Sequence, residues 1–309
     1  MKNAIALALS LVLALSLFAG CSDSSGDGAT PPANADATSA ADAPPASDAT
    51  PDATPEAASN AASEATPEAG AVSATSGNYS DEMKIAYGAD TSPEDGADSV
   101  ERAGDHTDSP YFSRLDFYNM TSTDTLTILP KYKTIQQTNE WSCGVAAALT
   151  VIDYFGKLGD NDEGTLAKLR PQGDAPSATS LDQEIAIFDA IGGFELTTTR
   201  DLGESVYDEF HLSTIRDYIN DGTPVLICWN DWGGHWQVII GYDTMGTDDY
   251  EGDDVIIVAD PYDTTDHNQD GYGVYGAERF IYNFTMYNFF GDDPADNDML
   301  FIAAKAVNS

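Results

Sequence analysis

One cysteine stands where a helix would make its thiol reactive. Cys143 ends the loop sequence QTNEWSC, and the apolar helical pattern VAAALTVIDYF begins two residues later. A helix N-terminus lowers the pKa of a thiol, and the thiolate is the nucleophilic form of cysteine. A buried cysteine that merely begins a helix would show the same pattern. We take Cys143 as the candidate nucleophile of a cysteine-histidine hydrolase.

Gln137 is the candidate for a second part of such a site. Its side-chain amide lies six residues before Cys143, on the loop that approaches the helix. An amide there can donate a hydrogen bond, together with the backbone N–H of Cys143, to the oxyanion that forms on an attacked carbonyl. The neighbouring Gln136 is an alternative polar residue of the same loop, and the spacing selects Gln137.

His235 is the candidate general base. It follows two glycines, at 233 and 234, and opens an apolar strand pattern, so the backbone there can pass close to a ligand. A lone histidine can also be purely structural, but this one has the best context for proton transfer. The other histidines lie in a boundary region, before a helix cap and in a polar loop: His106, His211 and His267.

Asp260 is the candidate partner of that histidine. If the strands on either side of residues 243–254 form an antiparallel hairpin with Tyr242 opposite Asp253, then His235 lies opposite Asp260. A carboxylate in that place holds the imidazole in one tautomer and stabilises its charged form. A slip of one residue would turn Asp260 to the other face, and Asp260 could instead only end a strand before Pro261. Two fallback candidates are Asp231 and Asp263.

The elements that must position these residues can be derived from periodicity and caps. Apolar residues at helical spacing predict helices over 143–155, 163–169, 181–191 and 214–220. Ser180, with Glu184, and Ser213 are the expected caps of the last two helices. Short apolar runs predict strands over 125–129, 225–229, 235–242, 255–259, 272–275, 280–284 and 300–306. Helices followed by strands favour an α+β fold, in which a helical half that carries the nucleophile packs against an antiparallel sheet that carries His235 and Asp260.

The N-terminus carries a secretory leader. Residues 1–20 contain Lys2, an apolar run and a small Ala-Gly pair, and the segment Leu-Phe-Ala-Gly-Cys resembles a bacterial lipoprotein signal. That resemblance implies cleavage before Cys21, lipidation of this cysteine and attachment to a membrane. The alternatives are an ordinary secretory signal or an uncleaved membrane helix. No later apolar run is long enough to span a bilayer.

Residues 21–105 have the composition of a disordered acidic tether. They are mostly Ala, Ser, Thr, Pro, Asp, Glu and Gly, with 17 acidic and 2 basic residues. Such a segment buries too little apolar surface to offset the loss of chain entropy on folding. As a coil it would span roughly 50 Å. We therefore place the single folded domain at residues 106–309.

The charge of the domain excludes one class of partner. The chain has a formal net charge of −39, and residues 106–309 hold 35 acidic and 10 basic residues. A nucleic-acid partner is excluded because a phosphate backbone needs a cationic face. The charge indicates a solvated surface, with a preference for cationic substrates as the sharper alternative. Of the three cysteines, Cys228 lies in an apolar strand pattern, and we expect it to be a buried small side chain.

One further motif lies in the strand-rich half. Asp266, Asn268, Asp270 and Gly271 match the start of an EF-hand calcium loop, but position twelve is Ala277 and not a glutamate. Without that bidentate ligand the motif is better explained as a polar turn, with calcium as the alternative.

Three segments together resemble the C39-like branch of the papain-like cysteine peptidases. These are QTNEWSCG with its helix, GGHW at a strand start, and VADPYD, and the likeness spans residues 125–285. The resemblance implies a papain-like fold and peptide-bond hydrolysis. It also implies the roles of oxyanion donor, nucleophile, base and orienter for Gln137, Cys143, His235 and Asp260. Family members commonly have an acidic residue before the cysteine, where this chain has Ser142.

These observations predict a lipid-anchored cysteine peptidase on the extracytoplasmic face of a membrane, acting on a peptide or protein. Such a site works without a cofactor or a metal ion. Two alternatives remain open: an amidase or acyl transferase that uses the same residues, and an inactive domain that serves as a surface binding module.

Overall fold

The computed structural model describes residues 82–91, 97, 109–113, 115–247, 249–264 and 266–307. The predicted leader, Cys21 and most of the predicted tether lie outside these described residues. So does His106.

The described residues form a mixed structure built on an antiparallel sheet, as the sequence predicts. The strand order is β2-β7-β3-β4-β5-β6, and β1 pairs with β4 away from this path. Every pair of neighbouring strands is antiparallel. The strands are β1 (Leu126–Ile128), β2 (Phe194–Thr198), β3 (Val225–Trp229), β4 (His235–Asp243), β5 (Val255–Ala259), β6 (Tyr272–Gly276) and β7 (Leu300–Ala306).

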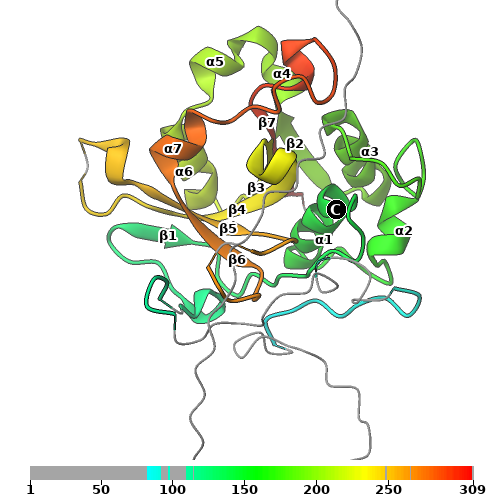
Figure 1. Ribbon diagram of the computed structural model, residues 1–309, viewed down its shortest axis with the longest axis horizontal. Helices are drawn as coiled ribbons and strands as arrows, with labels where there is room; N and C mark the ends of the chain where they lie inside the picture. Colours follow the sequence, from blue (N-terminus) through cyan, green and yellow to red (C-terminus); the bar gives the residue numbers. More distant parts are fainter. Residues whose placement is uncertain are drawn as a thin grey trace, which may run out of the picture. The chain divides into compact units, whose positions relative to one another are not determined.

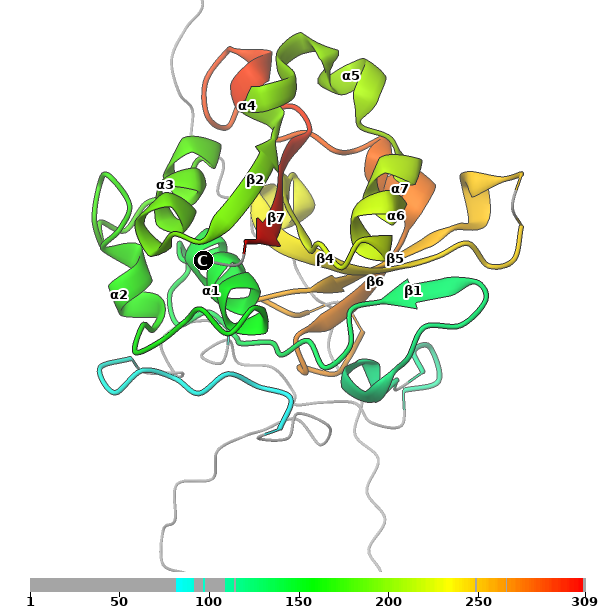
Figure 2. The same ribbon diagram turned by 180° about the vertical axis from the view of Figure 1, so that it is seen from behind.

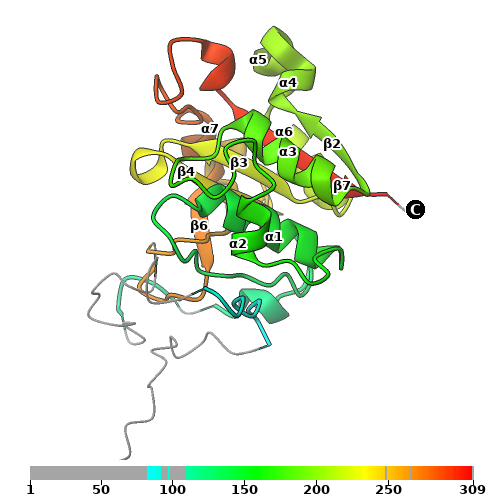
Figure 3. The ribbon, with the colours of Figure 1, turned by 90° about the vertical axis from the view of Figure 1, so that its right-hand side faces the viewer.

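The helices form two groups around this sheet. Figures 1 and 2 show α1, α2 and α3 together at one end and α6 and α7 at the other. Figure 3 shows α4 and α5 beyond the end of β2. The helices are α1 (Cys143–Tyr154), α2 (Glu163–Ala167), α3 (Leu181–Ile191), α4 (Thr199–Leu202), α5 (Val206–Glu209), α6 (Leu212–Asn220) and α7 (Ala277–Ile281). Among the described residues, none of the helices combines the length and apolar character needed to cross a membrane.

Helix α1 is the central helix of the fold. Its residues from Cys143 to Ile152 are all buried, and it packs against β4. A helix that is apolar on all sides is stable only when it is surrounded by protein. The helix ends where Gly156 adopts a φ of 66°, a left-handed conformation that glycine accepts without strain. The predicted α+β arrangement, with a helical part against an antiparallel sheet, is therefore confirmed.

Three local expectations are wrong. Residues 280–284 were expected as a strand, but α7 covers 277–281. Phe280 in this helix and Phe284 just beyond its end are both buried, with ring centroids 4.7 Å apart, so the chain turns back on itself here instead of extending as a strand. Helix α6 begins at Leu212 with His211 as its cap, not at Thr214 after Ser213. Strand β2 lies in a half that was expected to be helical, and it pairs with β7 at the sheet edge.

The cap of α3 differs in one residue from the expectation. The backbone N–H of Ser180 donates to Oε1 of Gln183 at 2.8 Å, so Gln183 and not Glu184 completes the capping box. The side chain of Glu184 is fully buried instead.

Part of the segment that composition assigns to the tether packs against the domain. Met83 and Ile85 are buried. The N–H of Ile85 donates to the carbonyl of Thr134 at 2.9 Å, and the N–H of Thr134 donates to the carbonyl of Met83 at 3.0 Å. Packed residues thus occur upstream of residue 106, because two apolar side chains and a short stretch of backbone pairing suffice to attach them.

Candidate active site

Cys143 occupies the first position of α1, directly against the end of the sheet. Its side chain is buried, and the backbone N–H groups of Trp236 and Gly144 donate hydrogen bonds to the sulfur. Burial alone would raise the pKa of the thiol. The hydrogen bond and the positive charge of His235 outweigh this effect, so that the pKa of Cys143 is lowered. These contacts therefore stabilise the thiolate of Cys143 relative to that of an ordinary cysteine.

His235 joins the cysteine to Asp260. Its Nε2 lies 2.6 Å from Oδ1 of Asp260, so the remaining ring nitrogen, Nδ1, is the one available for its hydrogen bond with Cys143. Burial alone would lower the pKa of His235, but Asp260 and the sulfur raise it to about 10. Burial alone would raise the pKa of Asp260. The imidazolium of His235 and the N–H of Tyr262, which donates to Oδ1 at 2.8 Å, lower this pKa instead. The three predicted residues meet in one buried chain of hydrogen bonds.

The strand register that brings them together differs from the predicted register. Val238 lies opposite Ala259 in the β4–β5 pair, so the next pair outward would be Gln237 with Asp260. The expectation that His235 lies directly opposite Asp260 is therefore wrong by two residues. Because side chains alternate with a period of two, a two-residue shift leaves Asp260 on the face of His235.

A β-bulge accounts for this even shift. At the far end of the hairpin Tyr242 lies opposite Ile256, three residues away from the expected Asp253. A shift of three would have turned Asp260 to the opposite face. Between Ile239 and Gly241 the register changes by one residue. At the site the shift is therefore two residues, and Asp260 stays on the face of His235.

Gln137 lies in the loop that leads to α1, and its amide has unused capacity. Its Nε2 donates to the carbonyl of Asn139 at 2.7 Å, while Oε1 has no hydrogen-bond partner within the described part of the chain. In Gln136, by contrast, Nε2 donates to the carbonyl of Asp260 at 3.1 Å and Oε1 accepts from the N–H of Asp263 at 3.1 Å. Gln136 thus connects the loop to the segment after β5 through both ends of its amide, whereas the hydrogen bond of the Gln137 amide lies within its own loop.

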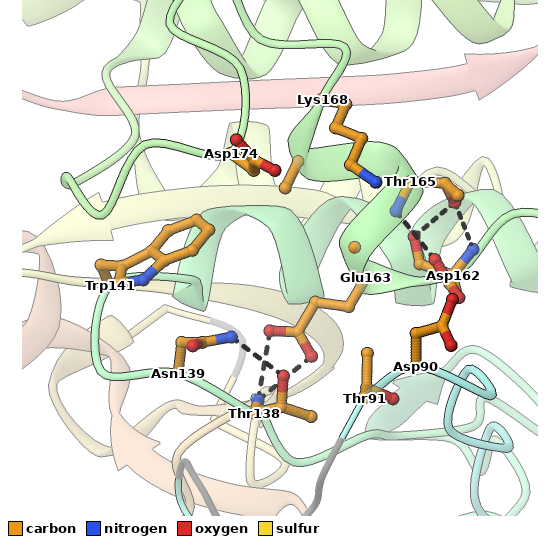
Figure 4. A pocket seen from close by; sticks show the side chains of 12 residues that line it. Asp90, Thr91, Thr138, Asn139, Trp141, Asp162, Glu163, Thr165, Lys168 and Asp174 are labelled. Carbon is orange, nitrogen blue, oxygen red and sulfur yellow. Dashed lines mark hydrogen bonds between the residues drawn. The ribbon is translucent and has the colours of Figure 1, made fainter.

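Glu163 is a buried carboxylate that sequence reasoning missed. The backbone N–H of Thr138 donates to both of its carboxyl oxygens, each at 3.1 Å from the nitrogen (Figure 4). It comes from α2, whose first turn Asp162 caps. Glu163 thus supplies a carboxyl group to the loop before Cys143, although the residue next to the cysteine is Ser142. No local spacing in the sequence points to this contact.

A cavity of about 280 Å³ lies beside the same loop. Figure 4 shows Trp141 on one side of it and Asp162, Asp90, Lys168 and Asp174 around it. Four of its twelve lining residues are acidic, and Lys168 is the one cationic side chain among them. Neither Cys143 nor His235 lines this cavity, so it adjoins the loop of the nucleophile and not the reacting groups.

The remaining acids and histidines that the sequence singled out have other partners. Oδ2 of Asp231 accepts from the hydroxyl of Tyr275 at 2.8 Å, and Oδ2 of Asp263 accepts from the N–H of Gly271 at 3.0 Å. A ring nitrogen of His211 lies 2.9 Å from the carbonyl of Asp208, and one of His267 lies 2.9 Å from the hydroxyl of Ser109. Of the described histidines, His235 is the one that contacts Cys143.

Cys228 is a free cysteine buried in β3, as expected of a small core side chain. Its Cα lies opposite that of Trp236 in the β3–β4 register. Burial, together with the negative charges of Cys143 and Glu184, raises the pKa of the Cys228 thiol well above its usual value. This sulfur stays protonated and unreactive.

The segment 266–271 is a turn held by its own side chains. Oδ1 of Asp266 accepts from the N–H of Asn268 at 3.0 Å, and Oδ1 of Asp270 accepts from the N–H of Tyr272 at 3.1 Å. These are the local bonds of Asx turns. Among the residues that the structure describes, no three His, Cys, Asp or Glu side chains are arranged to hold a metal ion.

Comparisons with known proteins concern the same part of the chain. A search of curated proteins found no match. Several solved structures are similar, two of them over 60% of this chain. One, described as a C39-like peptidase from Bacillus anthracis, is 14% identical with a TM-score of 0.41, over 60% of this chain and 100% of that one. The other, a double glycine motif protease from an AMS/PCAT transporter in complex with the leader peptide, is 16% identical with a TM-score of 0.35, over 60% and 96%. The model of the Peptidase_C39 like family matches residues 130–289. That match spans more than half of the chain, which therefore belongs to the Peptidase_C39 like family.

Proposed function

We propose that this protein is a cysteine peptidase that hydrolyses peptide bonds through Cys143, His235 and Asp260, with Gln137 as an oxyanion donor. The observation that carries the proposal is the imidazole of His235, which bonds Asp260 on one side at 2.6 Å and Cys143 on the other. Such a chain of contacts supports a thiolate–imidazolium pair, which is the reactive state of a cysteine peptidase.

In the first half of the reaction, the thiolate of Cys143 attacks the carbonyl carbon of the substrate and a C–S bond forms. The carbonyl oxygen becomes an oxyanion, to which the N–H of Cys143 and the amide of Gln137 donate hydrogen bonds. The intermediate collapses when the C–N bond breaks, and the imidazolium of His235 gives its proton to the departing amine. A thioester with Cys143 remains.

In the second half, water hydrolyses the thioester. Neutral His235 takes a proton from the water as the oxygen attacks the thioester carbon. The C–S bond then breaks, the carboxyl product leaves, and the thiolate–imidazolium pair is restored. Throughout, Asp260 holds the ring with Nδ1 toward the sulfur and stabilises its positive charge.

The proposal extends to the cellular location. The lipoprotein-like leader supports cleavage before Cys21 and lipidation of that residue, which would anchor the domain on the extracytoplasmic face of a membrane. The substrate is then a peptide or protein that reaches this face. A peptide substrate is in keeping with the double glycine motif protease, whose structure holds a leader peptide.

The test is cleavage of a mixed peptide library by the wild type and by Cys143→Ala, with products identified by mass spectrometry. We expect the wild type to cut and the variant to lose cleavage by at least about a thousandfold, because it lacks the nucleophile. Cys228→Ala is the matched control and should keep the wild-type rate. Cleavage that persists in Cys143→Ala would place the reaction elsewhere.

The same products separate the peptidase from its alternatives. Transfer of an acyl group to added amines, without peptide cleavage, would indicate a transferase. Binding of peptides without any covalent adduct on Cys143 would indicate an inactive binding module.

A further inference from the structure

A buried side-chain amide lies behind the proposed triad. Gln237 is fully buried in β4, two residues after His235 and on the same face of the strand. Its Nε2 lies 2.8 Å from Oδ2 of Asp260, which is the oxygen that does not face His235. The carboxylate of Asp260 is therefore held at both oxygens, by the imidazole at one and by this amide at the other.

The orientation of that amide follows from its other partner. The indole N–H of Trp229 lies 2.8 Å from Oε1 of Gln237. An indole nitrogen can only donate a hydrogen bond, so the atom that faces it must be the amide oxygen. The NH₂ group then has to face Asp260, and a flipped amide would oppose an N–H to an N–H.

The second hydrogen of the amide is also engaged. Nε2 of Gln237 lies 3.2 Å from Oδ2 of Asp231 and 3.1 Å from the hydroxyl of Tyr275, which itself donates to Asp231 at 2.8 Å. The titratable groups that face the His235–Asp260 pair are thus Cys143 from α1, Asp231 from the β3–β4 connection and Tyr275 from β6. Gln237 lies between the two carboxylates and donates to both.

We infer that Gln237 is a positioning residue for the proposed reaction. Oriented by Trp229, it donates to Asp260, so that the carboxylate stays turned toward His235 and Nδ1 of the ring stays turned toward Cys143. The inference rests on the proposed Cys143–His235–Asp260 triad. It adds Gln237 and Trp229, which touch neither the sulfur nor the oxyanion.

The test is the rate at which iodoacetamide reacts with Cys143 in the full chain, measured across pH. The dependence of this rate on pH reports the range over which the thiolate–imidazolium pair exists. This readout does not need peptide cleavage, so a protein that cuts no peptide still reports on the inference. Gln237→Met keeps the length of the side chain and removes the donor. A hydrogen bond to a charged group corresponds to about one to two pKa units. We therefore expect the pH above which the imidazolium loses its proton, the alkaline limit of the pair, to fall by up to about one to two pH units, because Asp260 is then free to turn away from His235.

Thr150→Val is the matched control. It removes two other buried hydrogen bonds of the Thr150 hydroxyl, with the hydroxyl of Tyr132 at 2.9 Å and to the carbonyl of Ala147 at 2.7 Å, and should lower stability without moving the alkaline limit. If Gln237→Met does not fold, Trp229→Phe replaces it, because loss of the indole N–H frees the amide to flip and should shift the limit in the same direction. A downward shift in the folded variant supports the inference. An alkaline limit equal to that of the wild type, or an equal shift in Thr150→Val, overturns it.

Discussion

At the scale of single residues, two buried thiols behave in opposite ways. Cys143 and Cys228 are both buried, but only the first has an imidazole and two backbone N–H groups as neighbours. The pKa of Cys143 is lowered, whereas burial raises the pKa of Cys228 well above its usual value. Burial therefore does not decide reactivity, because hydrogen bonds and nearby charge can outweigh the cost of desolvation.

This contrast predicts selective alkylation. At pH 7, iodoacetamide should label Cys143 at least about tenfold faster than Cys228, since each pKa unit changes the thiolate fraction up to tenfold. Mass spectrometry of peptide digests over time measures both rates in one sample. In denaturant the two rates should become equal. Slow and equal labelling of the folded protein would remove the assignment of Cys143 as the nucleophile.

A third buried titratable group lies beside the nucleophile. Glu184 is fully buried, and neither of its carboxyl oxygens has a hydrogen-bond partner among the described residues. Burial, reinforced by the negative charge of Cys143 and opposed by Arg170, raises its pKa well above the ordinary value of 4.5. Burial thus favours the neutral acid over the carboxylate, because an unpaired buried charge is very costly.

The raised pKa of Glu184 gives a pH-dependent stability. The folded state binds the proton more tightly than the unfolded state, so this contribution to stability is complete below pH 4.5 and is lost as the pH rises through the raised pKa. Glu184→Gln cannot ionise. Its free energy of unfolding, relative to that of the wild type, should therefore increase from pH 4 to pH 8 by up to about 1.4 kcal/mol per pH unit.

Urea unfolding at several pH values checks this prediction. The exposed Glu195 on β2 is the matched control, and Glu195→Gln should show no comparable pH-dependent gain. A constant difference between Glu184→Gln and the wild type from pH 4 to pH 8 would contradict the assignment.

At the scale of elements, the start of α1 packs tightly against its neighbours in α3 and β4. A Cβ atom on Gly144 would lie 2.8 Å from Oε2 of Glu184 and 2.9 Å from Cβ of Thr179, with the ring of Trp236 at 3.1 Å. Glycine is required there because a larger residue would push α1 away from α3 and from β4. The close approach also keeps Cys143 within reach of the backbone N–H of Trp236.

Gly144→Ala should therefore destabilise the fold by about 1–3 kcal/mol through overpacking. Gly164→Ala, in α2, is the matched control, because its nearest neighbour would be Oδ1 of Asp162 at 3.6 Å, an ordinary contact. That change should be neutral or stabilise the protein by up to about 1 kcal/mol, since alanine favours a helix. Urea unfolding measures both variants, and equal effects would show that the junction is not tightly packed.

At the scale of the whole molecule, the proposed enzyme combines an acidic domain with an anchored N-terminus. The chain carries 52 acidic and 13 basic residues, which favours a solvated surface and disfavours anionic partners. The leader sequence and the tether composition together suggest that the domain works at a distance from the membrane. The location proposed for it depends on Cys21.

Lipidation can be tested independently of catalysis. In a bacterial host, the wild type should incorporate labelled fatty acid and fractionate with membranes, and Cys21→Ala should do neither. The variant should still label at Cys143, because the two sites are far apart in sequence and in function. Fatty-acid incorporation that persists in Cys21→Ala would exclude this residue as the anchor.

Much of the fold follows from local patterns. Strands β3, β5 and β7 and helix α3 have the predicted bounds, because runs of apolar residues between turn signals depend on neighbouring positions alone. The expectation fails where distant contacts decide. Residues 280–284 were expected as a strand, but α7 ends at Ile281 and the ring of Phe280 in this helix packs on that of Phe284 just beyond it, while β2 is stabilised by β7 from the far end of the chain.

By itself, the sequence determined the family of the chain, the mixed α+β architecture and the proposed reacting residues, because each of these depends on residue types at short spacing. Only the tertiary structure decided which atoms meet. A bulge between Ile239 and Gly241 sets the face that Asp260 presents, and Glu163 and Gln237 reach the site from positions that no local motif marks. The physical reason is that register and burial result from packing between distant segments, whereas helix starts and apolar runs result from neighbours along the chain.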